Sequence, residues 1–305
     1  MRVVVTGATS MIGVALIQEC LANDCEVLAI VRKGTGRINR LPESDNIRIE
    51  YADLDSLDHV QGDGKSYDVF YHFAWGHTIK SERDEPLDQE DNIRSTLRAV
   101  ELANKLGCSK FIGAGSQAEY GPVDGVISSD TRTEPVTAYG MAKLSASMLS
   151  RKMCEKLGIR YIWGRIFSVY GCNDNDGTML NYAIDQFMKG ETARFSSATQ
   201  MWNYLYEEDA GKIFYLLGAK EVDSGVYCVA NQESRVLREY IEELQEMFGE
   251  NAKCEFAPVN SNVKAFGLQA DITKTVDATG FIPRTDFKEG IMKVVECKKN
   301  RGYNL

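Results

Sequence analysis

Three side chains in the middle of the chain have the types and spacing needed for proton transfer. Tyr139 and Lys143 are four residues apart, and Ser116 lies upstream of them. Positions i and i+4 share one face of a helix, so we expect the Lys143 ammonium to favour the phenolate of Tyr139 and to lower its pKa. Such a phenol can donate and accept a proton. The same spacing fits an exposed helix pair, so the surrounding sequence has to decide.

The N-terminus has the pattern of a strand, a glycine turn and a helix. Residues 2–5 are Arg-Val-Val-Val, residues 6–13 contain two glycines, and apolar residues then follow at helical spacing. In a dinucleotide-binding unit, Gly7 would permit the tight turn and Gly13 would let the helix pack on the strand. The helix N-terminus offers N–H groups to a pyrophosphate. Ser10 stands where a middle glycine is usual, and a glycine turn can also serve shape alone.

The composition is that of a globular protein. Of the 305 residues, 44% are hydrophobic and 26% are charged, which excludes a disordered or fibrous chain and allows one large or two coupled domains. The first residues form a core strand rather than a signal sequence, and no apolar run could span a membrane, so we expect a cytoplasmic protein. The net charge of −9 opposes nucleic-acid binding.

The cysteines and histidines do not predict a disulfide framework or a metal site. The eight cysteines are scattered without a Cys-x-x-Cys pair, so we expect them to be reduced and mostly buried. The three histidines, His59, His72 and His77, show no paired metal spacing, and they support neither a zinc site nor a serine-hydrolase triad. His72 ends an apolar strand and is expected to be structural.

Over residues 1–170, β-rich runs alternate with helical patterns. This alternation predicts a Rossmann-like, doubly wound α/β fold whose parallel sheet binds ligands at the carboxyl ends of its strands. Residues 171–305 mix shorter elements and are predicted to form mainly a smaller α/β substrate domain, with about 200–217 crossing back to the first. The predicted strands are Glu26–Val31, Ile47–Tyr51, Asp68–Phe73, Lys110–Ala114, Arg160–Ile166 and Trp202–Tyr206, and a helix is predicted near Leu180–Lys189.

Taken together, these segments resemble the extended short-chain dehydrogenase/reductase family, also called the NAD-dependent epimerase/dehydratase family, over essentially the whole chain. The resemblance implies that Tyr139 is the general acid and base, that Lys143 holds the nicotinamide ribose, and that Ser116 hydrogen-bonds the reacting oxygen. The matching pieces occur in family order: residues 6–13, Asp53-Leu54, His72-Phe73-Ala74, Asn92, Ser116, Tyr139 with Lys143, Arg165 with Val169-Tyr170-Gly171, and Tyr206 to Ala210.

The end of the second strand indicates the cofactor. A ribose 2′-hydroxyl is usually bound there by Asp or Glu, whereas a 2′-phosphate calls for a cation. Arg32 and Lys33 follow this strand, with a solvated basic turn as the alternative, so NADP(H) is favoured and NAD(H) remains open. The expected cofactor-binding residues are Gly7, Thr9, Ser10, Met11, Ile12, Gly13, Arg32, Asp53, Leu54, Phe73, Ala74, Asn92, Tyr139, Lys143 and Ile166.

Two departures from the family narrow the reaction. In its 4,6-dehydratases, Asp and Glu follow the catalytic Ser or Thr, whereas Gln117 and Ala118 follow Ser116 here, so dehydration is not expected. Glu119, one position further, should point elsewhere. Trp202 stands where many sugar-nucleotide epimerases carry an arginine for the substrate diphosphate, although its ring could stack on a base or sugar. The expected substrate-binding residues are Trp75, Gln117, Asn181, Arg194, Trp202 and Lys264.

The leading hypothesis is an NADPH-dependent reductase of a nucleotide-linked 4-keto-6-deoxy sugar. Hydride would reach the C4 carbonyl, and Tyr139 would protonate the alkoxide. The alternative is an NAD-dependent nucleotide-sugar 4-epimerase, while the intact Ser116, Tyr139 and Lys143 argue against a non-catalytic dinucleotide sensor. The resemblance also implies a homodimer that pairs the helices predicted at Leu87–Leu106 and Ala138–Leu157.

Overall fold

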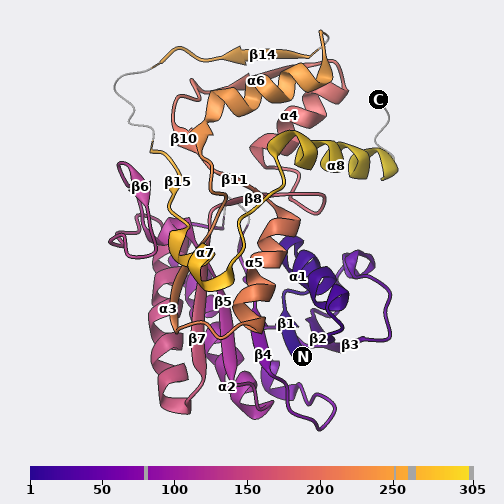
Figure 1. Cartoon of the computed structure of the whole chain (residues 1–305), viewed down its shortest axis with the longest axis vertical. Coiled ribbons are helices and arrows are strands. Elements are labelled where there is room, and N and C mark those ends of the chain that lie inside the picture. Colours follow the sequence, from indigo (N-terminus) through magenta and orange to yellow (C-terminus); the bar gives the residue numbers. More distant parts are fainter. Residues whose placement is uncertain (79–81, 251, 260–265, 302–305) are drawn as a thin grey trace.

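A seven-stranded parallel sheet forms the centre of the protein, shown here as a computed structural model that describes residues 1–78, 82–250, 252–259 and 266–301 (Figure 1). The strand order is β12-β7-β5-β4-β1-β2-β3. Starting from β1, the chain adds β2 and β3 on one side and then crosses to add β4 on the other, with every strand parallel to its neighbours, so the order of addition reverses between β1 and β4. The predicted Rossmann-like, doubly wound α/β fold is therefore confirmed. The strands are β1 (Arg2–Thr6), β2 (Glu26–Val31), β3 (Ile47–Tyr51), β4 (Val69–His72), β5 (Lys110–Ser116), β7 (Arg160–Ile166) and β12 (Gly225–Val229).

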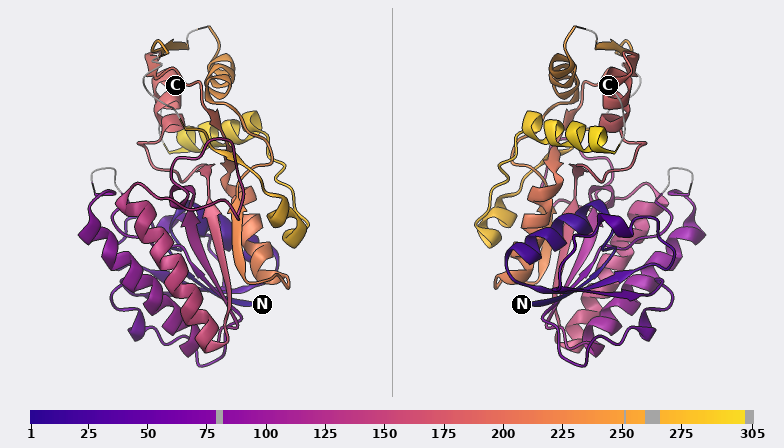
Figure 2. Two further views of the ribbon diagram at one scale, coloured as in Figure 1. Left: turned by 90° about the vertical axis from the view of Figure 1, so that its left-hand side faces the viewer. Right: turned by 90° about the vertical axis from the view of Figure 1, so that its right-hand side faces the viewer.

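Helices cover both faces of this sheet. Figure 2 shows α1 (Met11–Ala22) and α5 (Glu207–Ala219) on one face, and α2 (Pro86–Lys105) and α3 (Ala138–Leu157) on the other. Local signals in the sequence fix the two ends of α3. The Thr137 hydroxyl accepts from the Gly140 N–H at the start, and Gly158 adopts a left-handed conformation just after the end.

The predicted strands match the observed ones closely. Glu26–Val31, Ile47–Tyr51 and Arg160–Ile166 have the predicted bounds, and β-branched and aromatic residues make up about half of each strand. The fifth strand extends two residues beyond its predicted end and reaches Ser116, which is paired with Ile166 of the neighbouring strand. The catalytic serine candidate therefore lies at the carboxyl end of the sheet.

The C-terminal elements gather beyond the carboxyl ends of the sheet strands, at the top of Figure 1. The predicted strand Trp202–Tyr206 is split at Asn203, whose buried amide donates to the carbonyls of Asn231 and Glu233. The division at residue 170 stays a prediction. At this end of the molecule (Figure 1) lie α4 (Met179–Met188), α6 (Leu237–Phe248), α8 (Phe287–Asn300) and the strand pairs β9 (Thr192–Phe195) with β14 (Lys253–Phe256) and β10 (Met201–Trp202) with β13 (Arg235–Val236). The pairs β8 (Ser168–Tyr170) with β11 (Tyr204–Tyr206) and β6 (Val126–Ile127) with β15 (Gln269–Ala270) lie nearer the sheet in Figure 1, and α7 (Thr273–Thr279) packs against α5 and β12.

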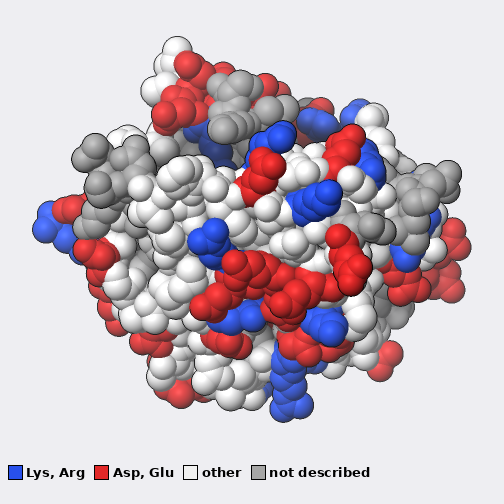
Figure 3. Space-filling view, turned by 90° about the horizontal axis from the view of Figure 1, so that it is seen from above, with Lys and Arg blue, Asp and Glu red and all other residues white. Residues whose placement is uncertain are grey.

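Acidic side chains gather on the end of the molecule that carries these elements (Figure 3). Helix α6, one of these elements, exposes Glu239, Glu242 and Glu246. The same helix buries Leu237, Ile241 and Leu244 on its other side, so its charged and apolar faces follow the helical period.

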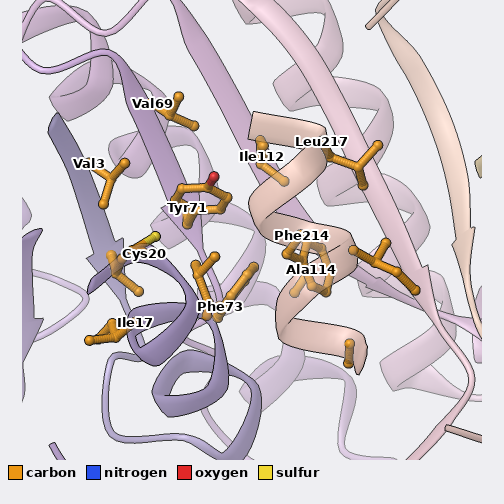
Figure 4. Packing of buried hydrophobic residues seen from close by; sticks show 14 of the residues in the cluster. Val3, Ile17, Cys20, Val69, Tyr71, Phe73, Ile112, Ala114, Phe214 and Leu217 are labelled. Atoms are coloured by element: carbon orange, nitrogen blue, oxygen red, sulfur yellow. The ribbon is translucent and has the colours of Figure 1, made fainter. Parts of the chain in front are cut away.

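Helix α5 lies on the sheet although its sequence follows the first C-terminal elements. Figure 4 shows Phe214 and Leu217 of α5 beside Tyr71, Phe73 and Ile112 of the sheet region. The rings of Phe73 and Phe214 are 4.7 Å apart between centroids. Helix α5 also packs along α1, so two distant parts of the chain build one apolar layer.

Two of the eight cysteines form a disulfide bond. Cys172, in the segment after β8, is bonded to Cys297 of α8, 125 residues later, so the expectation that all cysteines are reduced is wrong for this pair. The two residues meet only because α8 folds back against that segment. The other six are free, and all of them except Cys254 are buried, as expected. Among the described residues, no helix is long and apolar enough to cross a membrane.

Candidate active site

The turn between β1 and α1 leaves no room for side chains at its two glycines. Gly7 has a φ of +69°, and a Cβ atom on it would lie 2.6 Å from the backbone nitrogen of Ala74. A Cβ atom on Gly13 would lie 2.3 Å from the carbonyl oxygen of Gly7. The turn lies at the point where the strand order reverses, which is where parallel sheets of this type bind ligands.

Ser10 takes a structural part in the same turn. It is the N-cap of α1, and its hydroxyl accepts a hydrogen bond from the Gly13 N–H at 3.1 Å. A serine therefore serves at the position where a middle glycine is usual. Thr9, Met11 and Ile12 are partly exposed at this helix end, and the first-turn N–H groups of a helix lack partners within it.

The segments after β2 and β3 flank a shallow hollow. Arg32 and Lys33 are exposed, and neither forms an ion pair within the part of the chain that the structure describes. Asp53 is exposed as well, while Leu54 packs against the core beside α2. The Ser56 hydroxyl bonds to the backbone of Asp53 rather than to its carboxylate. The hollow, of about 390 Å³, is lined by Lys33, Gly34, Thr35, Ile38 and Tyr51.

Asn92 holds the segment that follows β4. Its buried side-chain oxygen accepts from the Gly76 N–H at 2.7 Å, and its amide donates to the Gly76 carbonyl at 3.2 Å. Both ends of the amide are thus committed to the protein backbone. Phe73 packs on α5, Ala74 lies against Gly7, and the half-buried Ile166 ends β7.

Ser116, Tyr139 and Lys143 come together at the carboxyl end of β5. Tyr139 and Lys143 lie one turn apart near the start of α3, and the Ser116 side chain lies near enough to the Tyr139 phenol to lower its pKa. The Lys143 ammonium is buried and donates to the Ala114 carbonyl at 2.7 Å. A helix on one face of the sheet and the end of a central strand therefore create this cluster.

The charges around Tyr139 differ from the sequence interpretation. Burial raises the pKa of Tyr139, and the strongest opposing influence is the guanidinium of Arg83, whose central carbon lies 4.0 Å from the ring centroid. The Lys143 nitrogen is 5.8 Å from the same centroid, and burial lowers the pKa of this lysine to about 7. Of these two cations, Arg83 thus lies closer to the Tyr139 ring. No motif marked Arg83 in the sequence.

The Glu119 carboxylate is held by neighbouring groups of the protein. It is fully buried and accepts hydrogen bonds from the Ser116 N–H at 2.8 Å, from the Trp163 indole at 2.9 Å and from Arg165 at 2.7 Å. The carboxylate is therefore committed to the ends of β5 and β7. Gln117, which precedes it by two residues, is partly exposed.

Trp75 forms a wall of the site. Its ring stands edge-on to Tyr139 with centroids 6.0 Å apart, and the Lys143 nitrogen lies 3.6 Å from its centroid. Its indole N–H donates to the buried Gln89 at 3.0 Å. Trp75 is thus held in place between the two side chains of α3 and helix α2.

The other expected substrate residues are spread over the C-terminal elements. Asn181 is buried and donates to the Asn175 carbonyl at 2.9 Å. The Trp202 indole nitrogen is buried and lacks a hydrogen-bond partner among the described residues. Arg194 lies on β9, exposed and paired with Glu255 of β14, away from the Tyr139 cluster. Lys264 falls outside the described residues.

Comparison with known proteins bears on this arrangement. The sequence profile of the NAD dependent epimerase/dehydratase family matches residues 3–230. A putative UDP-glucose 4-epimerase from Methanocaldococcus jannaschii is 21% identical over 310 residues, which cover 98% of each chain. The structure is similar to a UDP-glucuronic acid 4-epimerase from Bacillus cereus in complex with NAD, with a TM-score of 0.83, 21% identity and 100% coverage of both chains. A UDP-N-acetylglucosamine 4-epimerase from Methanobrevibacter ruminantium gives a TM-score of 0.87, 21% identity and 98% coverage of both.

The expected preference for NADP(H) is wrong, because the similar structure from Bacillus cereus contains NAD. The physical reason lies in the exposure of Arg32 and Lys33 after β2. An exposed cation without a fixed partner is solvated whether or not a phosphate lies nearby, so its presence alone does not identify the ribose.

Proposed function

Because the chain belongs to the NAD dependent epimerase/dehydratase family, we propose that it is an NAD-dependent 4-epimerase of a nucleotide sugar. The observation that carries this proposal is the assembly of Ser116, Tyr139 and Lys143 at the carboxyl end of β5, close to the glycine turn. Relatives named as 4-epimerases of UDP-linked sugars support uridine diphosphate as the nucleotide.

The residues around the glycine turn fit a dinucleotide. The lack of space at Gly7 and Gly13 keeps the backbone free of side chains where a pyrophosphate would lie against the start of α1. We assign the adenosine end to Asp53 and Leu54 and the nicotinamide ribose to Lys143. Bound NAD supplies the acceptor for a hydride from C4 of the sugar. The remaining residues proposed to contact the cofactor are Thr9, Ser10, Met11, Ile12, Arg32, Phe73, Ala74, Asn92, Tyr139 and Ile166.

Tyr139 moves the proton in this proposal. Its phenolate takes the proton of the sugar C4 hydroxyl while the C–H bond at C4 breaks, and it returns the proton when the hydrogen is restored on the opposite face. Ser116 hydrogen-bonds both the phenol and the reacting oxygen, which keeps the two aligned. Proton and hydride both return to the sugar, so the reaction has no net oxidation.

The neighbouring residues support epimerisation over elimination of water. Gln117 and Ala118 cannot serve as an acid and base pair, and Glu119 is committed to Trp163 and Arg165. On the substrate side, Trp75 and Gln117 border the sugar, while Asn181 and Trp202 lie among the elements proposed to hold the nucleotide. The orphan N–H of Trp202 is a donor that a diphosphate or base could use.

A product assay tests this function. The protein with NAD is incubated with UDP-glucose, UDP-galactose, UDP-glucuronate and UDP-N-acetylglucosamine, and the sugars are followed by proton NMR. We expect one C4 epimer to convert into the other from both directions, without net formation of NADH. Failure to invert C4 in any of these sugars, or consumption of reduced cofactor in proportion to product, would contradict the proposal.

A homodimer through α2 and α3 is also proposed, and a cytoplasmic location stays a prediction. Met141, Met148 and Leu149 of α3 are about half exposed, and Leu87 of α2 is 79% exposed. Apolar side chains on two adjacent helix faces favour burial against a second copy. Light scattering should give twice the 34.1 kDa chain mass, and Met148→Asp should shift the protein toward the single chain. A wild-type mass of one chain at micromolar concentration would rule out the dimer.

A further inference from the structure

A short segment before α2 reaches the start of α3, where Tyr139 lies. In this segment the Arg83 guanidinium lies over the Tyr139 ring, with its central carbon 4.0 Å from the ring centroid. Arg83 is otherwise an exposed residue in a turn. Its contact with the phenol therefore needs a reason beyond folding stability.

The backbone on each side of Arg83 is tied to a helix. Asp84 accepts a hydrogen bond from the Ala138 N–H at 2.7 Å, in the first turn of α3. On the other side, the buried Gln89 of α2 donates to the Glu82 carbonyl at 3.5 Å. Helices α2 and α3 pack against each other. The position of Arg83 is thus set by the same two helices that set the position of Tyr139.

We propose that Arg83 is a positioning residue for the general acid and base, holding the Tyr139 ring and stabilising its phenolate during proton transfer. This inference rests on the proposed function of Tyr139. It assigns to the catalytic centre a cation that comes from a different part of the chain than the Tyr139 and Lys143 pair.

The charged groups facing Tyr139 come from three elements. Burial and the Glu119 carboxylate raise the pKa of Tyr139, whereas Arg83 and the Ser116 side chain lower it. Glu119 is compensated by its 2.7 Å contact with Arg165. Lys143, on the same helix as Tyr139, is directed toward the Ala114 carbonyl and Trp75.

The two cations differ in how steadily they carry charge. Burial lowers the pKa of Lys143 to about 7, so this lysine is only partly protonated at neutral pH before the cofactor binds. A guanidinium stays protonated throughout the range in which enzymes work. Arg83 thus supplies a constant positive charge to the phenol.

The geometry suits arginine rather than lysine. A planar guanidinium can stack on an aromatic face over a broad area, whereas an ammonium is a compact point charge. Compared with a variant that has no charge at position 83, Arg83→Lys should therefore keep part of the stabilisation of the phenolate but position the Tyr139 ring poorly. Arg83→Met keeps a long apolar side chain and removes the charge entirely.

The direct test measures the acidity of residue 139. 3,5-Difluorotyrosine is placed at position 139, where its more acidic phenol titrates while the protein is folded, and fluorine NMR follows it in the protein as isolated. Arg83→Met should raise its pKa by about one unit or more. Arg94→Met, which removes an exposed arginine of α2 paired with Glu90, is the matched control and should leave the pKa unchanged. An equal pKa with and without Arg83 would overturn the inference.

Activity then separates this inference from the proposed function. With an epimerised substrate, Arg83→Met should lower kcat at least tenfold near neutral pH and move the acid limb of its pH profile to higher pH, with a smaller change in KM. Arg83→Lys should recover part of the shift. A changed fluorine titration without C4 epimerisation of any sugar would refute the function alone, and normal epimerisation with an unchanged titration would refute the role of Arg83 alone.

Discussion

At the scale of single residues, the phenol of Tyr139 is subject to opposing influences. Burial disfavours its charged form, while Arg83 and Ser116 favour it. Proton transfer requires the phenol to visit both forms, so neither influence can dominate. A small change in one neighbour should therefore alter the rate more than the stability of the protein.

Tyr139→Phe should remove most turnover, because the ring and its contacts with Trp75 and Arg83 are kept while the transferable proton is lost. General acid and base catalysis contributes roughly 10²–10⁴-fold in rate. NAD affinity, measured by calorimetric titration, should stay within a few-fold of wild type. Near-normal turnover of the variant would show that another group transfers the proton.

Glu207, at the start of α5, is a buried carboxylic acid whose ionisation links the stability of the protein to pH. One of its oxygens accepts the Cys172 N–H at 2.8 Å, and the other has no partner among the described residues. Burial raises its pKa from 4.5 to about 7. The folded protein thus holds this proton more tightly than the unfolded chain, and the resulting stability is lost as the pH rises through 7.

Glu207→Gln should remove this pH dependence, since the amide oxygen can still accept from Cys172 and the side chain never ionises. When the pH is raised from about pH 5 to about pH 8, the unfolding free energy of wild type should fall by about 1–3 kcal/mol more than that of the variant. Urea unfolding at both pH values checks this, with Glu239→Gln on exposed α6 as the control. The same change of unfolding free energy with pH in Glu207→Gln and in wild type would contradict the prediction.

At the scale of elements, α1 packs closely against β1 at the glycine turn, where we propose that NAD binds. The two elements come so close that a Cβ atom on Gly13 would overlap the Gly7 carbonyl. In the proposed function, the start of α1 has to stay at this distance for its N–H groups to face the pyrophosphate of NAD. The glycine is therefore a packing requirement as much as a turn signal.

Gly13→Ala should push α1 away from β1, lower the unfolding free energy by about 1–3 kcal/mol, and weaken NAD binding at least tenfold. Gly36→Ala is the matched control, because a Cβ atom there meets nothing within 4 Å. Thermal unfolding and calorimetry with NAD measure the two effects. An NAD affinity within about twofold of wild type would show that the turn tolerates a side chain.

At the scale of the whole molecule, the segment after β8 links the sheet to the C-terminal elements. Cys172 is bonded to Cys297, and Arg301 donates to the Cys172 carbonyl at 2.7 Å. From the side of the sheet, Arg40 donates to the Asn173 carbonyl at 3.1 Å. These contacts join parts of the chain that are far apart in sequence.

Cys297→Ser should lower the unfolding free energy by about 2–4 kcal/mol, the usual worth of a disulfide that closes a long loop. A thiol reductant should lower the melting temperature of wild type but not of the variant. Cys254→Ser, which removes a free cysteine, should behave like wild type. Eight reactive thiols in the denatured, unreduced protein, instead of the six expected, would contradict the bond.

The sequence by itself determined the features that depend on neighbouring residues. Runs rich in β-branched and aromatic residues gave the bounds of β2, β3 and β7, and the predicted helix Ala138–Leu157 is enclosed by the caps Thr137 and Gly158. The Tyr139 and Lys143 pair and the glycine turn were visible for the same reason, since period and spacing act within one or two turns of chain.

Only the tertiary structure decided which charge meets Tyr139, where Glu119 points and which cysteines bond. Arg83 reaches Tyr139 because α2 packs on α3, and Glu119 is held by Trp163 and Arg165 because β5 pairs with β7. Such contacts join residues far apart in sequence, and their pairing depends on how the whole core packs rather than on any local pattern.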